Sequence, residues 1–135
     1  MIALAFSILA SLALAFPALA QGQEPTGTYL SESGDTRVRI ARCGSAYCGT
    51  IVAVRGETKD VNNPDPALKT RNLVGVRMIS DIRPSGDGFE GSLYNYKDGK
   101  TYSGRMSFRS GNAMQLSGCV LGGLICRTQT WTRVN

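Results

Sequence analysis

The side chains that could carry out chemistry in this chain are limited first by the complete absence of histidine. Without imidazole there can be no Ser-His-Asp triad, no Cys-His pair and no zinc or haem held by histidine. Carboxylate, tyrosine, lysine and thiol chemistry remain. Two carboxylates, Asp60 and Asp65, lie in one loop, and three tyrosines gather at Tyr94, Tyr96 and Tyr102. An enzyme that uses carboxylate and tyrosine groups is therefore the catalytic class left open.

The loop from Asp60 to Asp65 offers oxygen atoms that could hold calcium, but its spacing does not match a known calcium loop. Pro64 interrupts the EF-hand pattern, and the glycine and the closing glutamate of that pattern are missing. An acid and base pair would need burial to raise the pKa of one carboxyl group, and a polar loop provides little burial. Asn-Pro and Asp-Pro are strong turn formers. We interpret the segment as a turn, and we expect no metal, no cofactor and no catalytic residue.

Residues 1–20 have the composition of an export signal. They carry no charge, they are rich in Ala and Leu, and they end in Ala18-Leu19-Ala20, a small-x-small pattern that a signal peptidase recognises. A membrane anchor is the competing interpretation, but the run is barely long enough to cross a bilayer and no Lys or Arg flanks it. The missing basic segment at the start departs from the usual signal pattern. We expect a signal peptide at 1–20, a single domain at 21–135, a periplasmic or secreted location, and no membrane segment after cleavage.

The four cysteines are Cys43, Cys48, Cys119 and Cys126. In an exported protein an even number of cysteines indicates disulfides. Closing a short loop loses less chain entropy than joining distant segments, which favours Cys43 with Cys48 and Cys119 with Cys126. A four-thiolate metal site is the alternative, but neither pair has the C-x2-C spacing of a zinc ribbon and exported thiols oxidise.

The elements that must position these groups are strands, because apolar and polar residues alternate along nearly the whole of residues 27–134. Glycine-rich turns separate eight such runs, and the one long connection spans Gly56 to Asn72. Eight strands in sequence order would expose two sheet edges unless the sheet closed, so we expect an antiparallel up-and-down barrel. A two-sheet sandwich is the alternative. The side chains expected to point inward, and to contact any ligand, are Val38, Ile40, Val52, Val54, Met78, Leu93, Tyr102, Met106, Phe108, Met114 and Leu116.

An ordered set of short motifs also runs through the chain. They are Cys43-Gly44, Tyr47-Cys48-Gly49, Asp60, Asn63-Pro64-Asp65-Pro66, Leu73, Gly75, Tyr94, Asp98-Gly99-Lys100-Thr101-Tyr102, Gly118-Cys119, Cys126, Gln129 and Trp131. With these motifs the chain resembles the bacterial exported family catalogued as domain of unknown function 2147. The resemblance implies a small lipocalin-like barrel in the periplasm or outside the cell, with no established activity. The family has Gly-x-Trp in its first strand, where this chain has Gly27-Thr28-Tyr29.

In lipocalin-like barrels a cationic side chain from the last strand covers the aromatic side chain of the first. The matching residues here are Arg133 and Tyr29, and Trp131 shares the strand face of Arg133. A guanidinium over an aromatic ring contributes roughly 0.5 to 2 kcal/mol and would link the first strand to the last. The alternative is that Arg133 is a solvated charge near the C-terminus and Trp131 belongs only to the core.

We therefore expect a disulfide-stabilised barrel that binds a small apolar or amphipathic molecule and is not an enzyme. The alternative is a filled barrel that contacts lipid or a protein in the cell envelope, and a net charge of +5 favours anionic surfaces over a neutral partner. Nucleic acid is not expected, because the arginines lack interleaved exposed aromatics. The aliphatic hairpin tip formed by Val120, Leu121, Leu124 and Ile125 either lies under the Gly56 to Asn72 connection or docks on such an envelope surface.

Overall fold

The computed structural model describes residues 3, 5, 9–12 and 24–135. The expected signal peptide lies largely outside the described residues, and its expected cleavage site after Ala20 lies wholly outside them. Within the part of the chain that is described, no helix is long and apolar enough to cross a membrane.

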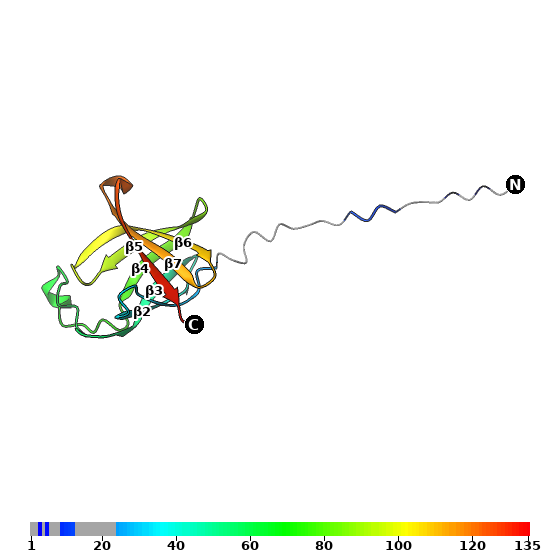
Figure 1. The fold of residues 1–135 in the computed structure, drawn as a ribbon. Helices are drawn as coiled ribbons and strands as arrows, with labels where there is room; N and C mark the ends of the chain where they lie inside the picture. Colours follow the sequence, from blue (N-terminus) through cyan, green and yellow to red (C-terminus); the bar gives the residue numbers. More distant parts are fainter. Residues whose placement is uncertain (1–2, 4, 6–8, 13–23) are drawn as a thin grey trace.

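Residues 27–133 form a closed barrel of antiparallel strands that follow one another in sequence order (Figure 1). The expected barrel is confirmed, and the two-sheet sandwich is wrong, because the first strand pairs with the last through Tyr29 opposite Arg133 and Leu30 opposite Thr132. Closure removes the sheet edges that would otherwise expose unpaired backbone groups. The strands are β1 (Gly27–Leu30), β2 (Thr36–Cys43), β3 (Ala46–Val54), β4 (Arg77–Ser85), β5 (Gly88–Asn95), β6 (Lys100–Ser110), β7 (Ala113–Val120) and β8 (Ile125–Arg133).

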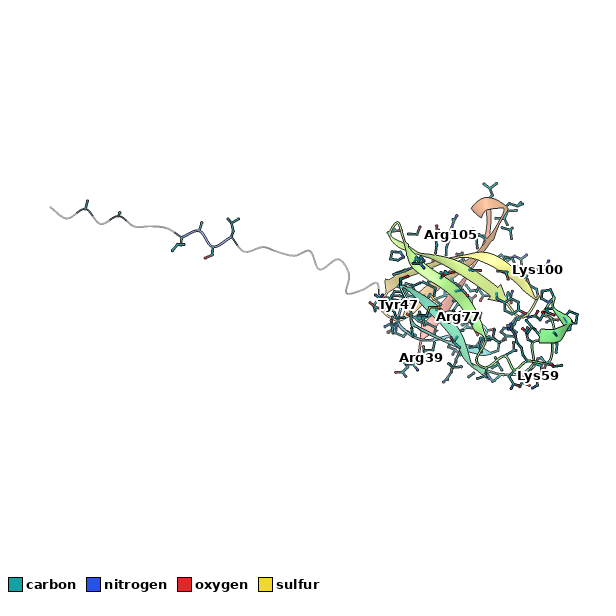
Figure 2. The ribbon with its side chains drawn as sticks, turned by 180° about the vertical axis from the view of Figure 1, so that it is seen from behind. Arg39, Tyr47, Lys59, Arg77, Lys100 and Arg105 are labelled. Carbon is teal, nitrogen blue, oxygen red and sulfur yellow. A yellow bond between two sulfur atoms is a disulfide. The ribbon has the colours of Figure 1, made fainter. Side chains whose placement is uncertain are left out.

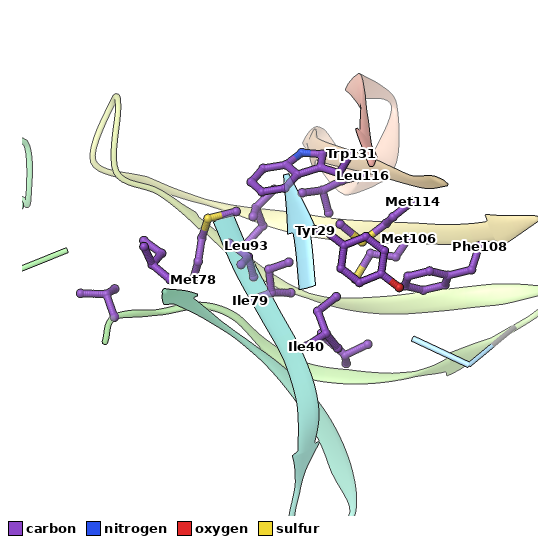
Figure 3. Close-up of a cluster of buried hydrophobic side chains, with 14 of the residues drawn as sticks. Tyr29, Ile40, Met78, Ile79, Leu93, Met106, Phe108, Met114, Leu116 and Trp131 are labelled. Carbon is purple, nitrogen blue, oxygen red and sulfur yellow. The ribbon is translucent and has the colours of Figure 1, made fainter. Parts of the chain in front are cut away.

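The apolar core fills one end of the barrel with aromatic side chains. The ring of Phe108 lies 5.9 Å from that of Tyr29 and 5.5 Å from that of Phe89, and Tyr47 continues the cluster 6.4 Å from Phe89. The two contacts of Phe89 are edge-to-face, a favourable arrangement for aromatic rings, and the rings of Tyr29 and Phe108 are tilted by 56°. Figure 3 shows Tyr29 beside Phe108 and Met106, and it shows Trp131 beside Leu116 farther along the barrel. The aromatic end of the barrel is therefore packed solid.

Two β-bulges change which residues face the core. In β3, Ala53 pairs with Arg37 and Ile51 pairs with Val38, so Val52 is an extra residue between them. An extra residue reverses the alternation of side chains along a strand. Ile51 is therefore buried and Val54 packs against the core, whereas Val52 is 41% exposed. The expectation that Val52 points inward is wrong for this reason.

The second bulge lies in β4, where the pairing with β5 shifts between Ser80 and Arg83. Asp81 adopts a left-handed backbone conformation there, with a φ of 51°. As a result Ile79 and Ile82, which an unbroken alternation would place on opposite faces, are both buried.

The long connection between β3 and β4 is held against the barrel by a buried carboxylate. Asp60 is fully buried and accepts hydrogen bonds from Tyr94 Oη at 2.6 Å, Asn63 Nδ2 at 2.8 Å and Arg71 Nε at 2.9 Å. Asn62 donates from its side-chain amide to the carbonyls of Tyr96 and Lys97 in the turn after β5. The connection thus closes over one side of the barrel end that carries this turn.

The two disulfides join the expected partners. Cys43 is bonded to Cys48 and Cys119 to Cys126, with Cα atoms 5.9 Å and 4.1 Å apart. Each disulfide lies across a hairpin: the first spans the turn between β2 and β3, and the second spans the short 3-10 turn Leu121–Gly123 between β7 and β8. Both short-loop pairings predicted from the spacing are confirmed.

Candidate functional site

A cavity of about 570 Å³ opens at the end of the barrel opposite the aromatic cluster. Its walls come from the β1–β2 turn, the β5–β6 turn and the ends of β6, β7 and β8. Its apolar floor is formed by Met78, Leu93, Leu116 and Trp131. Figure 3 shows these four side chains on one side of the buried cluster, away from Phe108. This volume lies in the range typical of sites for small molecules.

The side chains expected to contact a ligand divide by depth in the barrel. Met78, Leu93, Tyr102 and Leu116 line the cavity. Val54 is half-buried against the core, and Val52 lies outside the barrel. The remaining predicted residues belong to the packed core below the cavity; these are Val38, Ile40, Met106, Phe108 and Met114.

One side of the cavity mouth is tied together by an acidic side chain. Asp35 Oδ2 forms a 2.6 Å ion pair with Lys97 Nζ. The hydroxyls of Ser31, Ser33 and Thr36 donate hydrogen bonds to the other carboxylate oxygen, Oδ1. Burial alone would raise the pKa of Asp35, but these hydrogen bonds outweigh it and hold the pKa well below its usual range. The charge of Lys97 is therefore already balanced.

The same corner of the mouth is joined to the barrel wall by a hydroxyl pair. The hydroxyls of Thr36 and Tyr96 lie 2.5 Å apart and link the start of β2 to the turn that follows β5. This contact fixes the β1–β2 turn against the β5–β6 turn, so this side of the mouth is held in place by side chains from both.

The mouth also carries two cations, Lys100 at the start of β6 and Arg127 on β8. Lys100 has the strand parity of Tyr102, and Arg127 has that of Trp131, so both belong to the inner face of the barrel. Among the residues that the structure describes, neither side chain forms an ion pair. Tyr102 donates its hydroxyl to Asp98, and this hydrogen bond raises the pKa of Tyr102.

These mouth residues were not among those predicted from the sequence, although strand parity could have identified two of them. Counting back by two from Tyr102 reaches Lys100, and counting back by four from Trp131 reaches Arg127. The cavity wall expected from the sequence contains only uncharged side chains, so it includes neither cation.

The three residues expected at the barrel closure occupy two different places. Arg133 lies over the ring of Tyr29, with its Cζ atom 5.3 Å from the ring centroid, below the cavity. Trp131 instead forms part of the cavity wall, where its Nε1 donates a 3.3 Å hydrogen bond to Gln129 Oε1. The only tryptophan of the chain is therefore placed to report on whatever enters the cavity.

The aliphatic hairpin tip projects away from the barrel beside the cavity mouth (Figure 1). Its side chains Val120, Leu121, Leu124 and Ile125 are 40%, 69%, 86% and 55% exposed. The long connection therefore does not cover the tip, and the interpretation of the tip as a contact buried beneath that connection is wrong. Val120 and Ile125 also line the cavity, so the tip and the mouth form one continuous surface.

The carboxylates Asp60 and Asp65 have separate structural partners. Asp60 is engaged as described above, and Asp65 accepts a 3.0 Å hydrogen bond from the backbone N–H of Ala67 at the start of the 3-10 turn Pro66–Leu68. Burial would raise the pKa of Asp60, yet the hydrogen bonds from Tyr94, Asn63 and Arg71 lower it. No group of three or more Cys, Asp or Glu side chains in the described part of the chain is arranged to hold a metal.

Residues 27–133 match a family described as an uncharacterized protein conserved in bacteria, DUF2147. The chain belongs to this family. Among solved structures, the chain is similar to protein HP1028 from the human pathogen Helicobacter pylori, which belongs to the lipocalin family. The two are 25% identical with a TM-score of 0.75, and the match covers 84% of each chain. No curated protein matches significantly.

Proposed function

We propose that this member of the DUF2147 family is an exported barrel that binds one small apolar or amphipathic molecule in its open cavity and catalyses no reaction. The observation that carries the proposal is the cavity itself, with an apolar floor at Leu93, Leu116 and Trp131 and a polar mouth. Ligand sites commonly combine such an apolar interior with a few polar groups that orient the ligand. A filled barrel would leave no such space.

Two further observations support this function. The similar protein HP1028 belongs to the lipocalin family, and disulfides such as Cys43–Cys48 persist mainly in oxidising compartments outside the cytoplasm. The absence of catalysis is supported by the state of Asp60, because a carboxylate bound by Tyr94 and Arg71 has a lowered pKa and is a poor general acid.

The experiment is a titration of the purified protein with N-phenyl-1-naphthylamine, a neutral apolar fluorophore, monitored by quenching of Trp131 and by the emission of the probe. Gly118 lines the cavity, and a Cβ atom placed there would contact Leu93 and Tyr102 at 3.4 to 3.5 Å, which is tolerable packing. Gly118→Leu should therefore fill the cavity mouth and abolish probe binding while the melting temperature stays nearly unchanged.

The matched control is Gly111→Leu, since Gly111 is exposed and no atom lies within 4 Å of a Cβ placed there. This variant should bind the probe as the unmodified protein does. Absence of binding to the unmodified protein, or equal binding by Gly118→Leu, would contradict the proposal.

Met106→Trp serves a different purpose: Met106 lies in the packed core, so this change should destabilise the fold.

We also propose that the hairpin tip docks on an anionic lipid surface. Four exposed aliphatic side chains on one hairpin exceed what a solvent-facing turn needs. The guanidinium of Arg105 lies against Gly123 of the tip, Arg127 follows the tip on β8, and the net charge of the chain is +5. Apolar insertion combined with nearby cations suits a bilayer with negatively charged head groups. Because the tip borders the cavity mouth, docking would bring the mouth to the lipid.

A further inference from the structure

We infer that the molecule bound in the cavity is an amphiphile with a single negatively charged head group, and that Lys100 and Arg127 hold this head group. The inference rests on the proposed function, because it names the class of ligand for the same cavity. Figure 2 labels Lys100 at the start of β6, and Lys100 lines the cavity.

Backbone pairing places the two cations at different levels of the inner wall, with Lys100 at the start of β6 and Arg127 level with Gly104, four residues farther along that strand. Arg127 of β8 is opposite Gly118 of β7, and Gly118 is opposite Gly104 of β6, the strand that begins with Lys100. Side chains two residues apart on a strand share a face, so Lys100 stands above Tyr102, and Arg127 stands on the same face as Trp131. Both cations line the cavity.

A glycine opposite Arg127 leaves the route from the mouth to the floor open. Gly118 has no side chain, and beneath it lie the side chains of Leu93 and Tyr102. A ligand whose charged end lay between Lys100 and Arg127 would therefore extend its apolar part past Gly118 onto Leu116 and Trp131.

The charges at the mouth show which head group the cavity can accommodate. The acidic side chains there are Asp35, which is paired with Lys97, and Asp98, which accepts hydrogen bonds from the hydroxyl of Tyr102 and the backbone N–H of Lys100. Lys97, Lys100 and Arg127 carry three positive charges, and the two aspartates carry two negative ones, so the mouth has one positive charge in excess. A single anionic group balances that excess, whereas a cationic group would add to it.

Both cations are exposed side chains, and both border a cavity whose floor is apolar. Hydrogen bonds between charged partners are stronger than those between neutral groups, and they strengthen further where water is partly excluded. Lys100 and Arg127 both offer such donors, so an anion gains charge-assisted hydrogen bonds that an uncharged head group of similar size lacks.

The test compares ligands with the same ten-carbon chain and different head groups, using quenching of Trp131 to measure Kd. The ligands are decanoate, decyl phosphate, 1-decanol and decyltrimethylammonium. We expect the unmodified protein to bind decanoate or decyl phosphate about tenfold more tightly than 1-decanol, the equivalent of one good charged hydrogen bond. The ratio of the two anion affinities separates a carboxylate head group from a phosphate.

The variant Lys100→Met/Arg127→Met keeps the aliphatic stems and removes both charges. It should lose the preference for the anions while its affinity for 1-decanol stays the same. Arg37→Met/Arg39→Met is the matched control, because both arginines are exposed on the outer face of β2 and the change in net charge is identical. This control should keep the anion preference.

The outcomes separate the two proposals. If the unmodified protein binds 1-decanol and decyltrimethylammonium as tightly as the anions, the head-group inference is wrong and the cavity proposal stands. The inference is also wrong if Lys100→Met/Arg127→Met keeps the anion preference. If none of the four ligands quenches Trp131, the cavity proposal itself is wrong.

Discussion

Arg133 is joined to Tyr29 by two contacts at the seam that closes the barrel. Its Nη2 atom donates a 2.7 Å hydrogen bond to the phenolic oxygen of Tyr29, and its Cζ atom lies 5.3 Å from the centroid of the ring. The same hydroxyl donates a 3.0 Å hydrogen bond to the carbonyl of Pro25. Since β1 and β8 are paired over only two residue pairs, this side-chain link reinforces the shortest seam of the barrel.

Arg133→Met should lower the free energy of unfolding by about 1 to 2 kcal/mol, through loss of the cation–π contact and one charged hydrogen bond. Tyr29→Phe keeps the ring but removes the hydroxyl, and it should lower the stability by about 1 kcal/mol. Urea unfolding of both variants and of the double variant measures the coupling between them. Arg39→Met, on the exposed face of β2, is the control. Additive effects in the double variant would show that the pair does not act as a unit.

The buried carboxylate of Asp60 should make the stability of the protein sensitive to acid. Burial would raise the pKa of Asp60, but hydrogen bonds from Tyr94, Asn63 and Arg71 hold it below its ordinary value. At a pH between the folded and the unfolded pKa, the unfolded chain binds more protons than the folded one, so stability increases with pH. The contribution is therefore complete above about pH 5 and is lost as the pH falls through the lowered pKa.

Asp60→Asn removes this titration. Its free energy of unfolding should be lower than that of the unmodified protein at pH 7 and should change less between pH 5 and pH 2.5. Asp65→Asn is the matched control, since Asp65 lies in the same connection and its carboxylate only caps a 3-10 turn. Chemical unfolding at several pH values measures both slopes. Equal slopes for Asp60→Asn and the unmodified protein would contradict the assignment to Asp60.

The sequence predicts the barrel well because its information is local. Alternation marks the inner face of most strands, and turns such as Asp98-Gly99 separate them, so the order of the strands follows. The short spacing within each cysteine pair likewise predicts its partner. Closure then follows from the number of strands, because a barrel leaves no sheet edge unpaired.

The features that the sequence does not predict depend on contacts between distant residues. The bulge at Val52 reverses the alternation of β3, and only the pairing with β2 reveals it. Alternation also gives the face of a residue but not its depth, so Met106 in the packed core and Leu116 at the cavity floor look the same. The cluster of Asp60, Arg71 and Tyr94 joins a loop to a strand, and nothing in their spacing indicates it.

The N-terminal segment and the disulfides can be tested together on protein recovered from its native host. We expect the mature chain to begin at Gln21, because the small-x-small pattern ends at Ala20. Mass spectrometry of unreduced peptides should find Cys43 linked to Cys48, Cys119 linked to Cys126, and no free thiol. An uncleaved N-terminus together with free thiols would show that the protein stays in a reducing compartment.

The disulfide between Cys119 and Cys126 also closes the hairpin that carries the exposed tip. A cross-linked hairpin loses little conformational entropy when it binds a surface, so its aliphatic side chains can contribute most of their transfer free energy to docking. Leu121 and Leu124 are the most exposed of these, so the long connection buries neither of them. Their removal should therefore affect docking and leave folding unchanged.

Leu121→Ser/Leu124→Ser should abolish binding to vesicles that contain phosphatidylglycerol, measured by co-flotation, while the melting temperature stays within about a degree. Val61→Ser/Val74→Ser removes two other exposed aliphatic side chains and should leave vesicle binding intact. Binding should weaken as salt is added, because the cations Arg105 and Arg127 near the tip are screened.

A drop of several degrees in the melting temperature of Leu121→Ser/Leu124→Ser with vesicle binding unchanged would make the tip a structural contact. The unmodified protein could instead fail to bind these vesicles and retain a protein partner that Leu121→Ser/Leu124→Ser loses. That result would contradict docking on lipid and show that the tip binds a protein.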